Sequence, residues 1–234
     1  MNATLITVLE NKLMKAGMGR GVALVWGSFL NVWGGLLIKA HGELTSDAKW
    51  AEFVAPISGR PHENDLTVGL YHLIEEIIDG AEIDDPIRDY EIKTEEPIPD
   101  QTRRGSRSRR ADFKIKRRYA NAKPNHLAVE AKRILAKSEI KSKFLGDEGL
   151  GCFLMQDSPY TRGPVGIMLA YTFHAIGDFT EDIVTAITNE SNGIEIGQRN
   201  DRGQRIYIAL RKYNRTSLKV SPIVIMYSSL AFPD

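Results

Sequence analysis

Apolar and polar residues follow two different periods along this chain of 234 residues. Between residues 66 and 78, leucines and isoleucines recur every three or four positions, which predicts an amphipathic helix. Residues 111–118 and 126–134 show the shorter period of strands, and the loop 121–125 separates them. Further apolar segments predict one strand within 89–94, a buried strand at 166–174, a helix around 178–187 that begins with a capping box, and final strands at 205–210 and 223–227.

The N-terminal part has a different pattern. Residues 1–17 predict a short amphipathic helix, and Val22–Ile38 is apolar almost throughout. This run is short for a membrane span and contains polar residues and glycines, so we interpret it as a buried helix or a strand pair. A membrane-associated structural protein remains an alternative. The whole order of elements implies a mixed α/β fold.

Composition narrows the class of protein. With 42% hydrophobic residues, 26% charged residues and a net charge of +1, the chain is typical of a globular protein and has no global nucleic-acid signature. The single cysteine, Cys152, excludes an internal disulfide and a cysteine-based zinc site, and it fits a cytoplasmic location. Charge is unevenly distributed, because residues 81–100 are acidic whereas residues 103–118 are strongly basic.

The candidate chemistry lies on the two predicted neighbouring strands. Asp112 is on the first strand, and Glu130 and Lys132 are on the second, where alternation places them on one face. If the strands pair as a hairpin, Asp112 joins this face. Two carboxylates can hold a divalent cation and a lysine beside them can orient a water, which suits phosphodiester hydrolysis. Glu63, just ahead of the predicted helix, falls in phase with its apolar stripe.

A Glu-x-Lys triplet alone is a weak signal, because this chain has three others. Glu10–Lys12 and Glu139–Lys141 lie in predicted helices, where residues two apart do not share a face. Glu91–Lys93 could lie on a strand, but in an acidic stretch broken by prolines. Only Glu130–Lys132 follows an apolar strand start and has an acid on the preceding strand. The competing interpretation is an ordinary solvent-facing pair on a half-exposed strand.

A helix with Glu63, then Asp112, then Glu130-Ala131-Lys132, resembles the PD-(D/E)xK nuclease superfamily. The resemblance implies the restriction-endonuclease-like fold: a mixed central sheet flanked by helices, here at residues 61–234, after a helical N-terminal extension at 1–60. The proline of the motif is replaced by Ala111, a position that does no chemistry.

The resemblance also implies a function, namely hydrolysis of DNA with Mg²⁺ or Mn²⁺ as cofactor. Asp112, Glu130 and Lys132 would be catalytic, and Glu63, Asp112 and Glu130 would bind the metal. Positive side chains beside such a site can neutralise phosphates, so we expect DNA-backbone contacts from the basic stretch. These candidates are Arg109, Arg110, Lys114 and Lys116. A solvated loop is the alternative for residues 103–108.

Many nucleases of this kind are effector subunits of prokaryotic antiphage or restriction systems. By that analogy we expect a partner protein that controls or targets the chain, and homo-oligomers are compatible with it. The alternative from another class is a non-catalytic nucleic-acid-binding or scaffolding subunit that has a nuclease-like fold.

Overall fold

The computed structural model describes residues 3–15, 17–97, 110–118, 126–154, 159–177, 179–188, 194–199, 205–215 and 222–234. The helices are α1 (Ala3–Lys15), α2 (Arg20–Leu44), α3 (Asp47–Val54), α4 (Glu63–Asp79), η1 (Pro86–Asp89), α5 (Lys137–Glu139), η3 (Ile140–Phe144), α6 (Gly151–Leu154) and α7 (Thr180–Thr188). The strands are β1 (Tyr90–Pro97), β2 (Arg110–Arg117), β3 (His126–Arg133), β4 (Val165–Phe173), β5 (Ile194–Arg199), β6 (Arg205–Tyr213) and β7 (Ile223–Phe232).

The strands form one seven-stranded sheet in the order β1-β2-β3-β4-β7-β6-β5. The central strands β3, β4 and β7 are parallel, whereas β1 and β2 on one side and β6 and β5 on the other are antiparallel to their neighbours. The predicted α/β class with a mixed central sheet flanked by helices is therefore confirmed. Strand β5 has no counterpart in the prediction, and the helical region expected between residues 138 and 155 consists of short helical pieces.

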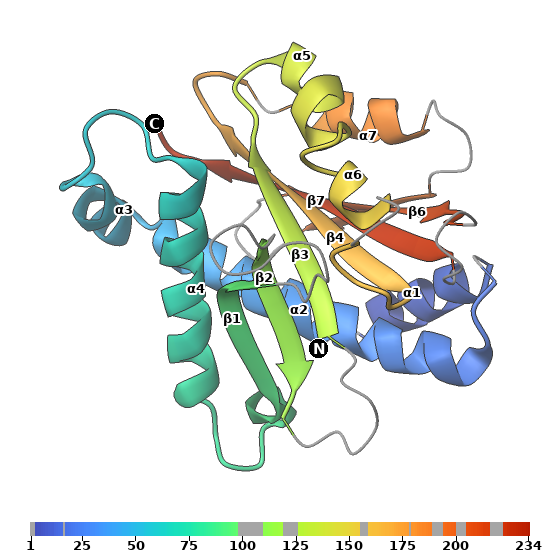
Figure 1. The fold of residues 1–234 in the computed structure, drawn as a ribbon. Coiled ribbons are helices and arrows are strands. Elements are labelled where there is room, and N and C mark those ends of the chain that lie inside the picture. Colours follow the sequence, from blue (N-terminus) through green and yellow to red (C-terminus); the bar gives the residue numbers. More distant parts are fainter. Residues whose placement is uncertain are drawn as a thin grey trace.

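Helices cover both faces of the sheet, as Figure 1 shows. The helices α2 and α4 pack on one face, where a large hydrophobic cluster joins them to the inward side chains of β2, β3, β4 and β7. The pieces η3, α6 and α7 contribute to a second cluster on the opposite face. The first cluster includes residues on both sides of position 60, the predicted boundary between extension and core.

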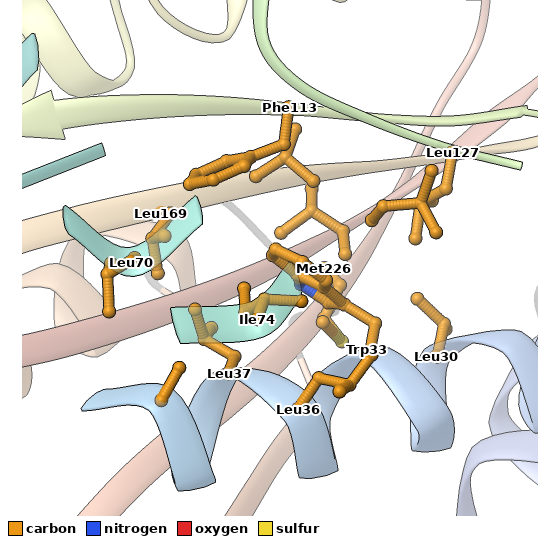
Figure 2. Close-up of a cluster of buried hydrophobic side chains, with 14 of the residues drawn as sticks. Leu30, Trp33, Leu36, Leu37, Leu70, Ile74, Phe113, Leu127, Leu169 and Met226 are labelled. Atoms are coloured by element: carbon orange, nitrogen blue, oxygen red, sulfur yellow. The ribbon is translucent and has the colours of Figure 1, made fainter. Parts of the chain in front are cut away.

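The apolar run at Val22–Ile38 is the middle of α2, so the helix alternative is the one observed. Trp33 and Leu37, four positions apart, point from α2 toward Phe113 on β2 and Met226 on β7 (Figure 2). By length and composition α2 could cross a membrane, and half of its most apolar window is buried within the fold. Burial on the sheet accounts for the inward half of the run, whereas Val22, Leu24 and Val25 are exposed.

Helix α4 begins one turn earlier than its apolar stripe suggested. Glu63 is its first residue and His62 its N-cap, ahead of the apolar residues that begin at Leu66. Asp65 contributes to the cap, because its carboxylate accepts the backbone N–H of His62 at 2.7 Å. Thr67, in the same part of the helix, is buried. As a result Glu63 is fixed to a regular first turn that packs beside the sheet.

Candidate active site

The candidate site lies where β2 separates from β3. The two strands pair from Lys116↔His126 to Phe113↔Val129, and this pairing ends before Asp112. Beyond that point β2 continues along β1, to Pro97↔Arg110, while β3 continues along β4, to Arg133↔Tyr171. Within the described ranges, the last residues of β3 therefore have an edge without a neighbouring strand, although β3 lies inside the sheet.

Two carboxylates occupy this gap and replace the missing strand. Asp112 Oδ2 accepts the backbone N–H of Ala131 at 2.6 Å, and Glu63 Oε2 accepts that of Arg133 at 2.7 Å. A second contact ties the start of α4 to β3, because Arg133 Nη1 donates to the Pro61 carbonyl at 2.8 Å. Buried backbone N–H groups need acceptors, so the divergence of the strands requires side-chain acceptors at these positions.

Lys132 connects the carboxylates. Its Nζ lies 2.7 Å from Glu130 Oε1 and 3.0 Å from Glu63 Oε1, and its side chain is 13% exposed. Burial alone would lower the pKa of this ammonium, but the charges of Glu130 and Glu63 raise it above the ordinary value. Lys132 is consequently protonated throughout the physiological pH range.

The two acids on the strands are less easily ionised. Burial raises the pKa of Asp112 to about 6, although the Ala131 N–H and Lys132 partly oppose the rise. Burial and the nearby charge of Asp112 raise the pKa of Glu130 well above its usual value. Glu130 Oε2 is buried and has no hydrogen-bond partner among the residues that the structure describes. A buried, unpartnered carboxylate oxygen is costly unless a cation or a proton compensates it.

The donor set fits a hard divalent cation at Asp112 and Glu130. Each of these carboxylates has one oxygen engaged by the protein, Asp112 by Ala131 and Glu130 by Lys132. Oxygen ligands of this type suit Mg²⁺ and Mn²⁺. Within the part of the chain that the structure describes, no three Asp, Glu, His or Cys side chains gather closely enough to form a metal cluster. Glu63, predicted as a third ligand, is directed to Lys132 and Arg133 instead.

The predicted DNA-contacting residues differ in their surroundings. Residues two positions apart on a strand point to the same face. Arg110, Lys114 and Lys116 therefore lie on the same face of β2 as Asp112. Arg110 is exposed and Lys116 half-buried, but Lys114 is only 9% exposed. Arg109 lies outside the described residues. Arg110 and Lys116 thus have the accessibility that a phosphate contact requires.

The other Glu-x-Lys triplets lie in different environments. Glu10–Lys12 is part of α1, and Glu139–Lys141 spans α5 and η3. Glu91 and Lys93 do form an ion pair at 3.0 Å, but on the edge strand β1 and with both side chains more than a third exposed. Glu130–Lys132 therefore differs from two of the triplets in lying on a strand, and from Glu91–Lys93 in lying inside the sheet with largely buried side chains.

A buried pair of hydroxyl groups lies next to the site, and the sequence did not predict this pair as part of it. Thr67, one turn after Glu63 on α4, lies 3.1 Å from the Tyr171 hydroxyl, and both side chains are buried. Tyr171 neighbours Arg133 in the sheet. Its signal in the sequence was only a tyrosine within an apolar strand, whose hydroxyl needs a partner when buried.

We expect Tyr171→Phe or Thr67→Val to lower the free energy of unfolding by about 1–2 kcal/mol, because either change leaves one hydroxyl buried without a partner. The double variant should be no less stable than either single one, since both hydroxyls are then gone. Urea denaturation of the four proteins measures this. Strictly additive losses would show that the two hydroxyls do not interact.

Comparisons of the chain with protein-family models, curated proteins and solved structures give no match. The arguments for function therefore rest on the site's own residues: Asp112, Glu130 and Lys132 meet at the gap between β2 and β3, and Glu63 reaches them from α4.

Proposed function

We propose that this chain is a metal-dependent nuclease of the PD-(D/E)xK type, with a restriction-endonuclease-like core, which hydrolyses DNA phosphodiester bonds with Mg²⁺ or Mn²⁺. The observation that carries the proposal is the convergence of Asp112, Glu130 and Lys132 at an opening within the sheet, joined by Glu63. Elements far apart in sequence supply these groups. Their gathering in a largely buried, charge-imbalanced place is typical of functional sites, since such an arrangement destabilises the fold.

The residues have separate roles in this proposal. Asp112 and Glu130 would hold the cation, and a bound divalent cation polarises the scissile phosphate and lowers the pKa of the attacking water. Lys132 orients that water with its ammonium and offsets negative charge on the phosphate. Lysine suits this role because its compact charge sits on a flexible stem, whereas the planar fork of arginine imposes its own geometry.

Recognition of DNA would depend on the backbone. Arg110 and Lys116 lie on the same strand and face as Asp112, where they can contact phosphates on either side of the scissile bond. Such contacts carry no sequence information, so a partner protein would supply the target. We propose, by analogy of fold and chemistry alone, a role as an effector subunit in prokaryotic antiphage defence.

The experiment is a cleavage assay on supercoiled plasmid, linear duplex, single-stranded DNA and RNA with the purified chain. We expect phosphodiester cleavage with Mg²⁺ or Mn²⁺ and none with EDTA, because Asp112 and Glu130 need a cation to act on phosphate. Cleavage that persists unchanged in EDTA would contradict the proposal. Tight DNA binding without cleavage under every metal condition would instead favour a non-catalytic subunit.

A further inference from the structure

Glu63 is fully engaged by the protein itself. Its Oε1 accepts from Lys132 Nζ at 3.0 Å, and its Oε2 accepts from the Arg133 N–H at 2.7 Å. Moving Oε2 to a cation would leave the Arg133 N–H without an acceptor at a strand edge that has no neighbouring strand. The bonding of Glu63 therefore favours a role in holding Lys132 over a role as a ligand.

Lys132 lies between two acids, Glu130 and Glu63, to which we assign different roles. It is closer to Glu130 than to Glu63, at 2.7 Å against 3.0 Å. Glu130 Oε1 is engaged by Lys132, and Glu130 Oε2 is buried without a hydrogen-bond partner among the described residues. A divalent cation bound at Oε2 would lie beside the Lys132 ammonium, and the repulsion between the two positive charges favours movement of Lys132 toward Glu63.

The charge balance agrees with an exchange of partners. Glu63, Asp112 and Glu130 bring three carboxylates against the single ammonium of Lys132, so the site is short of positive charge. One divalent cation added to Lys132 would neutralise three carboxylates. The three carboxylates can therefore balance the charges of both Lys132 and a divalent cation, provided that Lys132 breaks its ion pair with Glu130 and retains the one with Glu63.

We propose that Lys132 is an internal counter-ion that yields Glu130 to the divalent cation and remains on Glu63, so that Glu63 affects cation binding only through Lys132. The inference rests on the proposed function in one respect, since Asp112 and Glu130 are taken as the cation ligands. It assigns Glu63 as a positioning residue and makes Lys132 a determinant of cation affinity.

The test is a double-mutant cycle on Mn²⁺ affinity, measured with the full chain by the electron paramagnetic resonance signal of free Mn²⁺. The proteins are wild type, Lys132→Gln, Glu63→Gln and the double variant, at pH 7.5 and without DNA. Lys132→Gln should bind Mn²⁺ about tenfold more tightly, because no charge-assisted hydrogen bond to Glu130 has to be broken. Glu63→Gln should weaken binding several-fold, since Lys132 then has only Glu130 as a partner.

The double variant decides the role of Glu63. In the Lys132→Gln background, Glu63→Gln should change Mn²⁺ affinity by no more than about twofold, as for residues that do not interact directly. Equal weakening in both backgrounds would make Glu63 a ligand and overturn the inference. Should Lys132→Gln fail to fold, Lys132→Met offers an unbranched side chain of similar length for the same cycle.

The counter-ion role of Lys132 and the metal site itself can be tested separately. If Glu130→Gln abolishes Mn²⁺ binding but Lys132→Gln does not tighten it, the counter-ion role is wrong and the proposed metal site stands. If wild type and Glu130→Gln bind Mn²⁺ equally, or neither binds it, the metal site of the proposed function is itself wrong.

Discussion

Replacing Glu130 by glutamine should reduce the rate of DNA cleavage by about a thousandfold or more, since a metal-polarised phosphate contributes several kcal/mol of transition-state stabilisation. Glutamine keeps the size of the side chain but offers a neutral amide, which is a poor ligand for Mg²⁺. The fold should persist, because the change removes a buried carboxylate whose pKa is raised by burial and by Asp112. Single-turnover cleavage of a labelled duplex at saturating Mg²⁺ measures the rate.

The chain contains a matched control for this variant. Glu91 belongs to the same Glu-x-Lys spacing, lies on the same sheet and forms a 3.0 Å ion pair with Lys93, but on the exposed edge strand β1. Glu91→Gln should therefore leave cleavage unchanged. A Glu130→Gln protein that cuts DNA as fast as the Glu91→Gln protein would remove Glu130 from the mechanism.

Asp112→Asn should make the protein more stable at neutral pH, by about 3 kcal/mol, while inactivating it. The folded protein raises the pKa of Asp112 from 3.8 to about 6 because the side chain is buried, and each pKa unit corresponds to about 1.4 kcal/mol. An asparagine oxygen can still accept the Ala131 N–H, so the contact that bridges β2 and β3 is retained. The variant therefore lacks only the unfavourable free energy of a buried, ionised carboxylate.

The difference in stability between wild type and Asp112→Asn should depend on pH. Below pH 3.8 the Asp112 carboxyl is protonated in both folded and unfolded chains, so wild type and variant should be similarly stable. As the pH rises from 3.8 to about 6, the unfolded chain ionises first, and wild type loses stability relative to the variant. Above that range the contribution of Asp112 itself to the difference is constant.

Chemical denaturation at about pH 3 and at pH 7 would measure both limits. Asp89→Asn is the control, because Asp89 is an exposed acid that pairs with Arg117 at 3.2 Å, and exposed pairs contribute only about 0–1 kcal/mol. If Asp112→Asn destabilised the protein at pH 7, the burial of a charged Asp112 would not be the dominant influence on stability at this site.

Local patterns were sufficient to predict the elements that carry the site. The alternation at 111–118 and 126–134 corresponds to β2 and β3, and the helical phase of α4 put Glu63 on the correct face. These signals are local, since side-chain direction follows from the period of a single element. The strand context also ranked Glu130–Lys132 above the other triplets before any pairing was known.

Long-range arrangements were not predictable in the same way. The sequence could not distinguish a helix from a strand pair at Val22–Ile38, because a run that is apolar on all sides has no period, and packing on the sheet decides it as α2. The divergence of β2 from β3 depends on competition between neighbouring strands. Without that gap, nothing in the sequence indicated that Glu63 would bond to Lys132 and Arg133.

The opening between β2 and β3 has a consequence for how such a protein can diversify. All the groups that meet there belong to regular elements: Glu63 to α4, Asp112 to β2, and Glu130 and Lys132 to β3. The connections at 98–109 and 118–125 contribute none of the four side chains. Insertions or substitutions in these connections would therefore leave the four side chains in place, because α4 and the strands of the sheet carry them.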